Sequence, residues 1–155
     1  MNKNIFREYD IRGIYPIDLN EDIYFGIGNA IAYKCNQLSI DSIVLGRDGR
    51  LSGKSLMNAL ENSLLNNGIN VENIGIVTSP LLYYAAKKHS SKSGIMVTGS
   101  HNPKEYNGIK MIINDEPVSG KEIFELISTP NSASSKGTST INEAVSYTHL
   151  TLPTR

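Results

Sequence analysis

Apolar runs and amphipathic stretches alternate along this chain. The apolar runs are short and end in glycine or polar residues, as buried strands do. They cover 42–46, 71–77, 95–97 and 109–113. Between them, apolar residues recur at helical spacing and predict helices over 20–37, 52–67, 78–89 and 119–127. Strands that alternate with helices predict an α/β fold, a three-layer α/β/α domain with a mixed, largely parallel sheet.

Both flanks of this pattern are less regular. Apolar and polar residues roughly alternate over 5–14, which predicts a half-buried strand that Gly13 interrupts. Gly99 is expected to take a backbone angle that other residues avoid, so that Ser100 points out of the sheet edge. Asn107-Gly108 predicts a turn, after which 109–113 returns as a strand and makes the sheet mixed.

Composition narrows the class of protein. The 155 residues are enough for one domain with its own core, and 15 basic against 15 acidic side chains give a formal net charge of zero. This balance predicts no nucleic-acid partner and no membrane-attracted face. Cys35 is the one cysteine, so no internal disulfide can form, and we expect a cytoplasmic protein. No long apolar run follows Met1, which predicts neither a signal peptide nor a membrane-spanning helix.

The segment 94–103 is the strongest candidate for chemistry. Its apolar strand ends in small and polar residues, among them Ser100. A serine held on a stiff elbow after a strand is suited to act as a nucleophile or a phosphate carrier. The same residue types are also common in ordinary turns. The neighbouring His101 does not by itself make a catalytic pair, because neighbours in sequence usually point apart.

Several polar side chains are predicted to meet at one edge of the sheet. Arg12, Arg47, Ser100 and Lys110 all lie near predicted strand ends. In open sheets of this kind, sites form outside the carboxyl ends of the strands. An arginine in such a site suits phosphate, because it is always charged and presents several donors.

Four strings of residues resemble the α-D-phosphohexomutase family, the phosphomannomutase and phosphoglucomutase enzymes. They are Tyr9-Asp10-Ile11-Arg12-Gly13, Gly46-Arg47-Asp48-Gly49-Arg50-Leu51-Ser52, Thr78-Ser79-Pro80 and Thr98-Gly99-Ser100-His101-Asn102-Pro103. The last string resembles the active-site serine loop of the family. The strings stand in the expected order, and the resemblance covers roughly residues 5–128.

The resemblance implies a mechanism and a set of site residues. Ser100 would carry a phosphoryl group and pass it to a hexose monophosphate, with glucose 1,6-bisphosphate as activator. Lys110 and Arg12 would be catalytic, with Lys110 assisting proton transfer. A Mg²⁺ would bind Ser100 through its phosphate, together with three aspartates of the family. The other implied residues are Tyr9, His101 and Asn102 at the phosphosugar, and Arg47 and Asp48 in a supporting loop.

Only the first of four family domains is expected in this chain. Residues 1–130 are predicted to form the serine-loop domain, and 131–144 a Ser/Thr/Gly-rich linker or the start of the next domain. Residues 145–155 resemble a translated sequencing adapter, so we expect a non-native tail. The sequence contains no Asp-x-Asp-x-Asp loop for the metal. We therefore expect a fragment with little or no turnover. Its expected partners are the missing domains.

Two other interpretations stay open at this point. The chain could be a fragment of a phosphoglucosamine mutase, or a non-catalytic α/β binding module. The second would explain the missing domains, but not why several active-site motifs coincide. The preferred hexose, mannose or glucose, is not decided by these residues.

Overall fold

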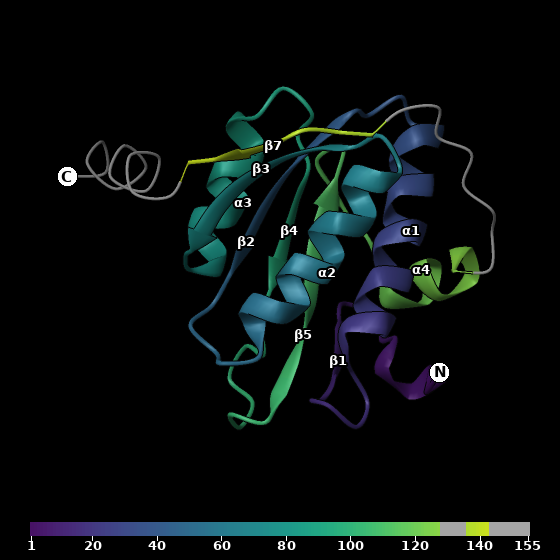
Figure 1. The fold of residues 1–155 in the computed structure, drawn as a ribbon, viewed down its shortest axis with the longest axis vertical. Coiled ribbons are helices and arrows are strands. Elements are labelled where there is room, and N and C mark those ends of the chain that lie inside the picture. The colour runs from purple at the N-terminus through teal and green to yellow at the C-terminus, as the bar shows by residue number, and fades with distance from the viewer. Residues whose placement is uncertain (128–135, 143–155) are drawn as a thin grey trace.

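The computed structural model describes residues 1–127 and 136–142, which form three layers (Figure 1). Helices α1 (Glu21–Gln37) and α2 (Gly53–Asn66) pack together on one face of a sheet, with the short α4 (Gly120–Leu126) beside α1. Helix α3 (Ser79–Lys88) covers the other face. The predicted α/β/α class is confirmed.

The described sheet has seven strands and both kinds of pairing. They are β1 (Ile11–Ile14), β2 (Ser42–Arg47), β3 (Asn70–Ile76), β4 (Gly94–Val97), β5 (Tyr106–Ile113), β6 (Glu116–Pro117) and β7 (Ser139–Ile141). Their order is β1-β5-β4-β2-β3-β7, with β6 paired to β5. Strand β2 is parallel to β3 and β4, and β3 to β7. Strand β5 is antiparallel to β1, β4 and β6. The sheet is mixed, as predicted.

Side-chain caps set where the helices begin. The side chain of Asn20 accepts from the backbone N–H of Ile23 at the start of α1. Thr78 and Ser119 cap α3 and α4 in the same way. Each such cap contributes about 1 kcal/mol, which explains why the predicted helix starts agree with the structure to within a residue or two.

Most of the core lies between the sheet and the α1–α2 pair. The largest fully buried side chains include Tyr24, Ile27, Ile31, Leu56, Leu60 and Leu64 from these helices. A smaller cluster joins Leu82 of α3 to Val44, Ile74 and Met96 of the sheet. Each buried aliphatic side chain contributes roughly 1.5–3 kcal/mol, so the two clusters hold both helical layers on the sheet.

The predicted strand over 5–14 is wrong in its first half. A 3-10 helix, η1 (Lys3–Ile5), opens the chain, and only Ile11–Ile14 form β1. The backbone N–H of Arg7 donates to the Asp10 carbonyl at 2.9 Å, which closes a turn between the two elements. The alternation of apolar and polar residues over 5–10 therefore does not correspond to a strand, because this segment forms a 3-10 helix and a turn.

The turn predicted at Asn107-Gly108 is also wrong, because both residues lie inside β5. Gly108 faces Arg12 of β1, and a Cβ there would lie 2.0 Å from the Ile11 carbonyl oxygen. The glycine serves the close approach of two strands. The side chain of Asn107, fully buried, donates to Ser52 Oγ at 2.8 Å.

Part of the predicted linker belongs to the sheet. Ser139–Ile141 form β7, which extends the parallel part of the sheet beside β3. Residues 131–135 and 143–144 of the predicted linker, and the predicted tail at 145–155, lie outside the described residues. Within 1–127 and 136–142, no helix combines the length and the apolar character that crossing a membrane requires.

Candidate active site

The loop between β4 and β5 carries Ser100 at the edge of the sheet. Strands β2 and β4 end at this edge, and the antiparallel β5 begins there. Ser100 itself has a φ of 55°, in the left-handed region that costs an L-residue free energy. The positive angle was predicted one residue earlier. Gly99 does not have it, so the serine is aimed by its own backbone.

Lys110 is the polar group that the structure brings to Ser100. Its Nζ lies 3.4 Å from Ser100 Oγ, within reach of a long hydrogen bond in which the ammonium donates. Lys110 stands opposite Met96 on the neighbouring β4. Both Ser100 and Lys110 are half-buried, so the pair remains accessible to a ligand.

Asp48 ties the end of β2 to the serine loop. Its Oδ2 accepts from Thr98 Oγ1 at 2.8 Å and from the Gly99 backbone N–H at 3.0 Å. Thr98 Oγ1 in turn accepts from the Ser100 backbone N–H at 2.9 Å. Asp48 thus lies where a supporting loop was predicted. Among the hydrogen bonds of the described residues, Arg47 has none to the serine loop, and it donates to the carbonyl of Asp48 at 3.2 Å.

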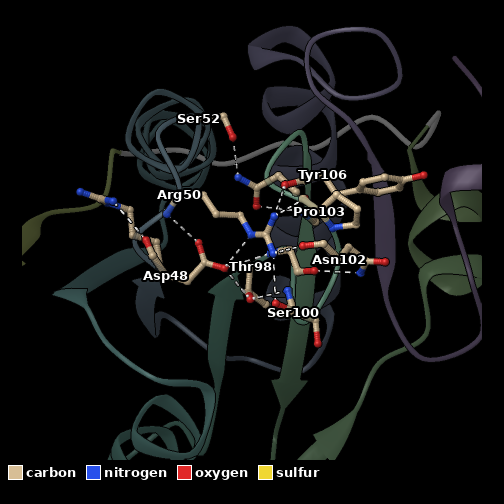
Figure 2. Close-up of polar contacts among 12 residues, drawn as sticks. Asp48, Arg50, Ser52, Thr98, Ser100, Asn102, Pro103 and Tyr106 are labelled. Atoms are coloured by element: carbon tan, nitrogen blue, oxygen red, sulfur yellow. Dashed lines mark hydrogen bonds and ion pairs between the residues drawn. The ribbon is translucent and has the colours of Figure 1, made fainter.

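Arg50 is the residue that the sequence analysis missed. Figure 2 shows its guanidinium inside the serine loop, where it donates to the backbone carbonyls of Ser100, Asn102, Pro103 and Tyr106. The only signal in the sequence is a second arginine in the turn after a strand. Nothing in the sequence says that this arginine reaches across some fifty residues while Arg47 does not.

Gly99 is a glycine because of Arg50. A Cβ at Gly99 would lie 2.2 Å from Arg50 Cζ and 2.3 Å from Nε. These separations are far inside the 3.5–4.0 Å at which carbon atoms normally touch. The guanidinium therefore rests directly on the Gly99 backbone.

The other predicted site residues differ in their surroundings. Arg12 pairs with Asp10, whose carboxylate is almost buried, at 2.6 Å. Because Arg12 faces Gly108, its side chain projects from the same face of the sheet as Lys110, two residues along β5. The Asn102 side chain donates to the Gly99 carbonyl at 2.8 Å and so helps to shape the loop.

Tyr9 and His101 are exposed, and neither contacts Ser100 through a hydrogen bond within the described residues. Tyr9 is 85% exposed. The structure thus brings Ser100, Lys110 and Asp48 together, places Arg12 on the same sheet face, and leaves Tyr9 and His101 at the surface.

A buried tyrosine supports the site from below. Tyr24 of α1 donates its hydroxyl to the Gly108 carbonyl at 2.9 Å. Burial, with a smaller contribution from the negative charge of Asp48, raises the pKa of Tyr24 well above its usual value. The hydroxyl therefore stays protonated and remains a donor to β5.

The described residues do not fit a Mg²⁺ site by themselves. Within 1–127 and 136–142, no three His, Cys, Asp or Glu side chains lie close enough to share a metal. The hydroxyl of Ser100 faces an ammonium, and Asp48 already accepts from the serine loop. Mg²⁺ prefers several oxygen ligands, which these residues do not supply together.

These observations define a class of three-layer α/β/α domains. In this class a loop at the sheet edge, held here by Arg50 and Asp48, presents a serine to a lysine on the neighbouring strand. The chain belongs to the phosphoglucomutase/phosphomannomutase family, because residues 3–135 match that family's α/β/α domain I.

Named relatives agree with this assignment. A phosphoglucomutase of Neisseria gonorrhoeae is 47% identical over 127 residues, which cover 82% of this chain and 28% of the relative. A phosphomannomutase/phosphoglucomutase of Pseudomonas syringae is 42% identical over 139 residues, covering 88% of this chain and 30% of the relative. The chain thus spans less than a third of the length of either relative.

A solved structure shares the fold. The crystal structure of a phosphoglucomutase/phosphomannomutase family protein from Burkholderia thailandensis superimposes with a TM-score of 0.85 at 32% identity. The similarity covers 92% of this chain and 34% of that protein.

Proposed function

We propose that Ser100 is the phosphoryl carrier of a phosphohexomutase that interconverts hexose 1-phosphate and hexose 6-phosphate. The observation that carries this proposal is the approach of Lys110 Nζ to Ser100 Oγ at 3.4 Å on a clamped loop. The relatives are named for glucose and mannose, which favours these hexoses over glucosamine. A non-catalytic binding module would not need the lysine beside the serine.

The proposed step is an in-line transfer from phosphoserine to sugar. A hydroxyl oxygen of the hexose monophosphate attacks the phosphorus, and the bond between phosphorus and Ser100 Oγ breaks. The Lys110 ammonium gives its proton to the departing serine oxygen, and the attacking hydroxyl loses its proton to solvent. A positioned acid of this kind contributes typically about 10²–10⁴-fold to the rate.

The bisphosphate sugar then reorients in the site and returns its other phosphate to Ser100. In this return step the phosphorus–oxygen bond of the sugar breaks and the bond to Ser100 Oγ forms. The hydroxyl proton of Ser100 passes to Lys110 in its neutral amine form, and the departing sugar oxygen takes a proton from solvent. The lysine is thereby restored to its charged form for the next cycle.

Further residues are proposed to hold the phosphosugar. Arg12 projects from the same face of the sheet as Lys110, and a guanidinium pairs well with phosphate oxygens. Tyr9 and His101 are exposed, and Asn102 is fixed in the loop, so all three could contact a bound sugar. The remaining parts of a full-length phosphohexomutase are the proposed partners, and the cytoplasm is the proposed location.

Phosphosite mapping tests the proposal. The purified chain is incubated with glucose 1,6-bisphosphate, with and without Mg²⁺, and intact mass and peptide spectra are recorded. We expect one phosphate, on Ser100, that is absent in Ser100→Ala and present in the control Ser90→Ala, which alters an exposed serine outside the loop. Phosphate that persists in Ser100→Ala, or no phosphate at all, would contradict the proposal.

The role of Lys110 and the low activity of the chain are tested alongside. Lys110→Met removes the ammonium and keeps the length of the side chain, so phosphorylation of Ser100 should slow by about 10²-fold or more. An equal rate in Lys110→Met would exclude the lysine as the proton donor and acceptor. Turnover of hexose phosphates should be very low in the 155-residue chain, and a clear turnover lost in Ser100→Ala would contradict that expectation.

A further inference from the structure

The serine loop turns its backbone carbonyls inward. The oxygens of Ser100, Asn102, Pro103 and Tyr106 all point at one small volume, where the guanidinium of Arg50 lies (Figure 2). Carbonyl dipoles that converge in this way repel one another unless donors lie between them. Without a cation at its centre, the loop would have to open to water.

Arg50 supplies a donor for every one of these acceptors. Its NH1 group donates to Pro103 and Tyr106 at 2.5 and 3.1 Å, and its NH2 group to Ser100 and Asn102 at 3.1 and 2.7 Å. Its Nε donates to Asp48 Oδ2 at 3.3 Å. A guanidinium has five N–H donors, and all five have partners here.

Two further features make the space occupied by the Arg50 side chain specific for a flat cation. Gly99 leaves no side chain under the guanidinium, where a Cβ would lie 2.2 Å from Arg50 Cζ. Asp48 balances the positive charge and at the same time holds the Thr98 hydroxyl and the Gly99 N–H. The Arg50 side chain is only 15% exposed, so water replaces these bonds poorly.

We propose that Arg50 is a positioning residue that holds Ser100 in its left-handed conformation beside Lys110. The proposal rests on the phosphoryl-transfer function proposed above. Arg50 acts through the loop and does not bind phosphate, because its five donors are already used within the protein. Lysine cannot replace it, since an ammonium has three donors and no planar fork.

The test follows amide hydrogen exchange, residue by residue, in the full 155-residue chain. In Arg50→Lys and Arg50→Ala, the Gly99 and Ser100 amides should exchange at least about tenfold faster, the loss expected for one hydrogen bond to a charged group. Amides in α1 and β2 should keep their rates. The matched control is Arg47→Lys, which changes the arginine that does not reach the loop.

Chemical rescue supplies a readout that a merely structural role would not move. Arg50→Ala leaves a guanidinium-shaped space over Gly99, so methylguanidinium should restore slow exchange and the rate of Ser100 phosphorylation. Methylammonium at the same concentration should restore neither. If Arg50→Ala does not fold, Arg50→Lys gives the same exchange comparison.

The two proposals fail in different ways. Exchange at Ser100 that Arg50→Lys leaves unchanged, or exchange that rises equally over the whole chain, would overturn the positioning role whatever the phosphorylation result. Loop exchange that responds as expected, in an unsubstituted chain that never becomes phosphorylated, would overturn the proposed function, while Arg50 would still be the residue that holds the loop.

Discussion

Replacement of Gly99 by alanine tests the contact between Arg50 and the serine loop by changing a residue of the loop. The new Cβ would lie 2.2, 2.3 and 2.7 Å from Arg50 Cζ, Nε and NH1. Because carbon atoms normally touch at about 3.5–4.0 Å, the guanidinium has to move by more than about 1 Å. Its hydrogen bonds to the loop, now 2.5–3.1 Å long, cannot all survive such a shift.

The size of the effect follows from the bonds lost. A hydrogen bond to a charged group contributes about 1.5–3 kcal/mol net, and we take two of the four loop bonds as lost. Alanine restricts the unfolded chain, which returns about 0.4–1 kcal/mol. Gly99→Ala should therefore lower the free energy of unfolding by about 2–6 kcal/mol, and the melting temperature by roughly 4–24 °C.

Urea unfolding followed by circular dichroism measures this change. The matched control is Gly49→Ala in the neighbouring loop, where a Cβ would meet nothing within 4 Å. Neither glycine has a left-handed φ, so backbone strain does not separate the two variants. Gly49→Ala should be neutral or slightly stabilising. Equal stabilities of the two variants would refute the account of Gly99 as the seat of Arg50.

Two further predictions concern buried groups away from the loop. Tyr24→Phe should lower the free energy of unfolding by about 1 kcal/mol, because the Gly108 carbonyl loses one of its two donors, and unchanged urea unfolding would contradict this. Burial raises the pKa of the Cys35 thiol to about 12, so iodoacetamide at pH 8 should label it only after unfolding; mass spectrometry showing rapid labelling of the folded chain would be the contrary result.

Local signals in the sequence predicted the elements, because their causes are local. Asn20, Thr78 and Ser119 precede helices and cap them through bonds to residues three positions away. The buried faces follow from apolar spacing in the same way. The family resemblance predicts Ser100 and Lys110 as site residues, and in the structure Lys110 Nζ lies 3.4 Å from Ser100 Oγ.

The contact of Arg50 with the serine loop could not be predicted, because the two segments are about fifty residues apart in the sequence. Gly99 and Gly108 look like turn glycines, but each makes room for a segment far along the chain, Arg50 in one case and Ile11 in the other. Asp48 was predicted as support, whereas Arg50 was overlooked in favour of Arg47. Which of two arginines in one turn reaches a loop depends on the direction of the strand exit, which residue types do not encode.

The register between β5 and β4 decides which side chain of β5 lies beside Ser100. Lys110 faces the serine because it stands opposite Met96, and its neighbour Met111 points into the core on the other side. A slip of one residue would exchange the two, putting a methionine beside Ser100 and an ammonium in the core. The strand register therefore places Lys110 on the face of the sheet from which it reaches Ser100. An insertion in the loop that spares the Arg50 contacts should change the loop surface while leaving Lys110 in place.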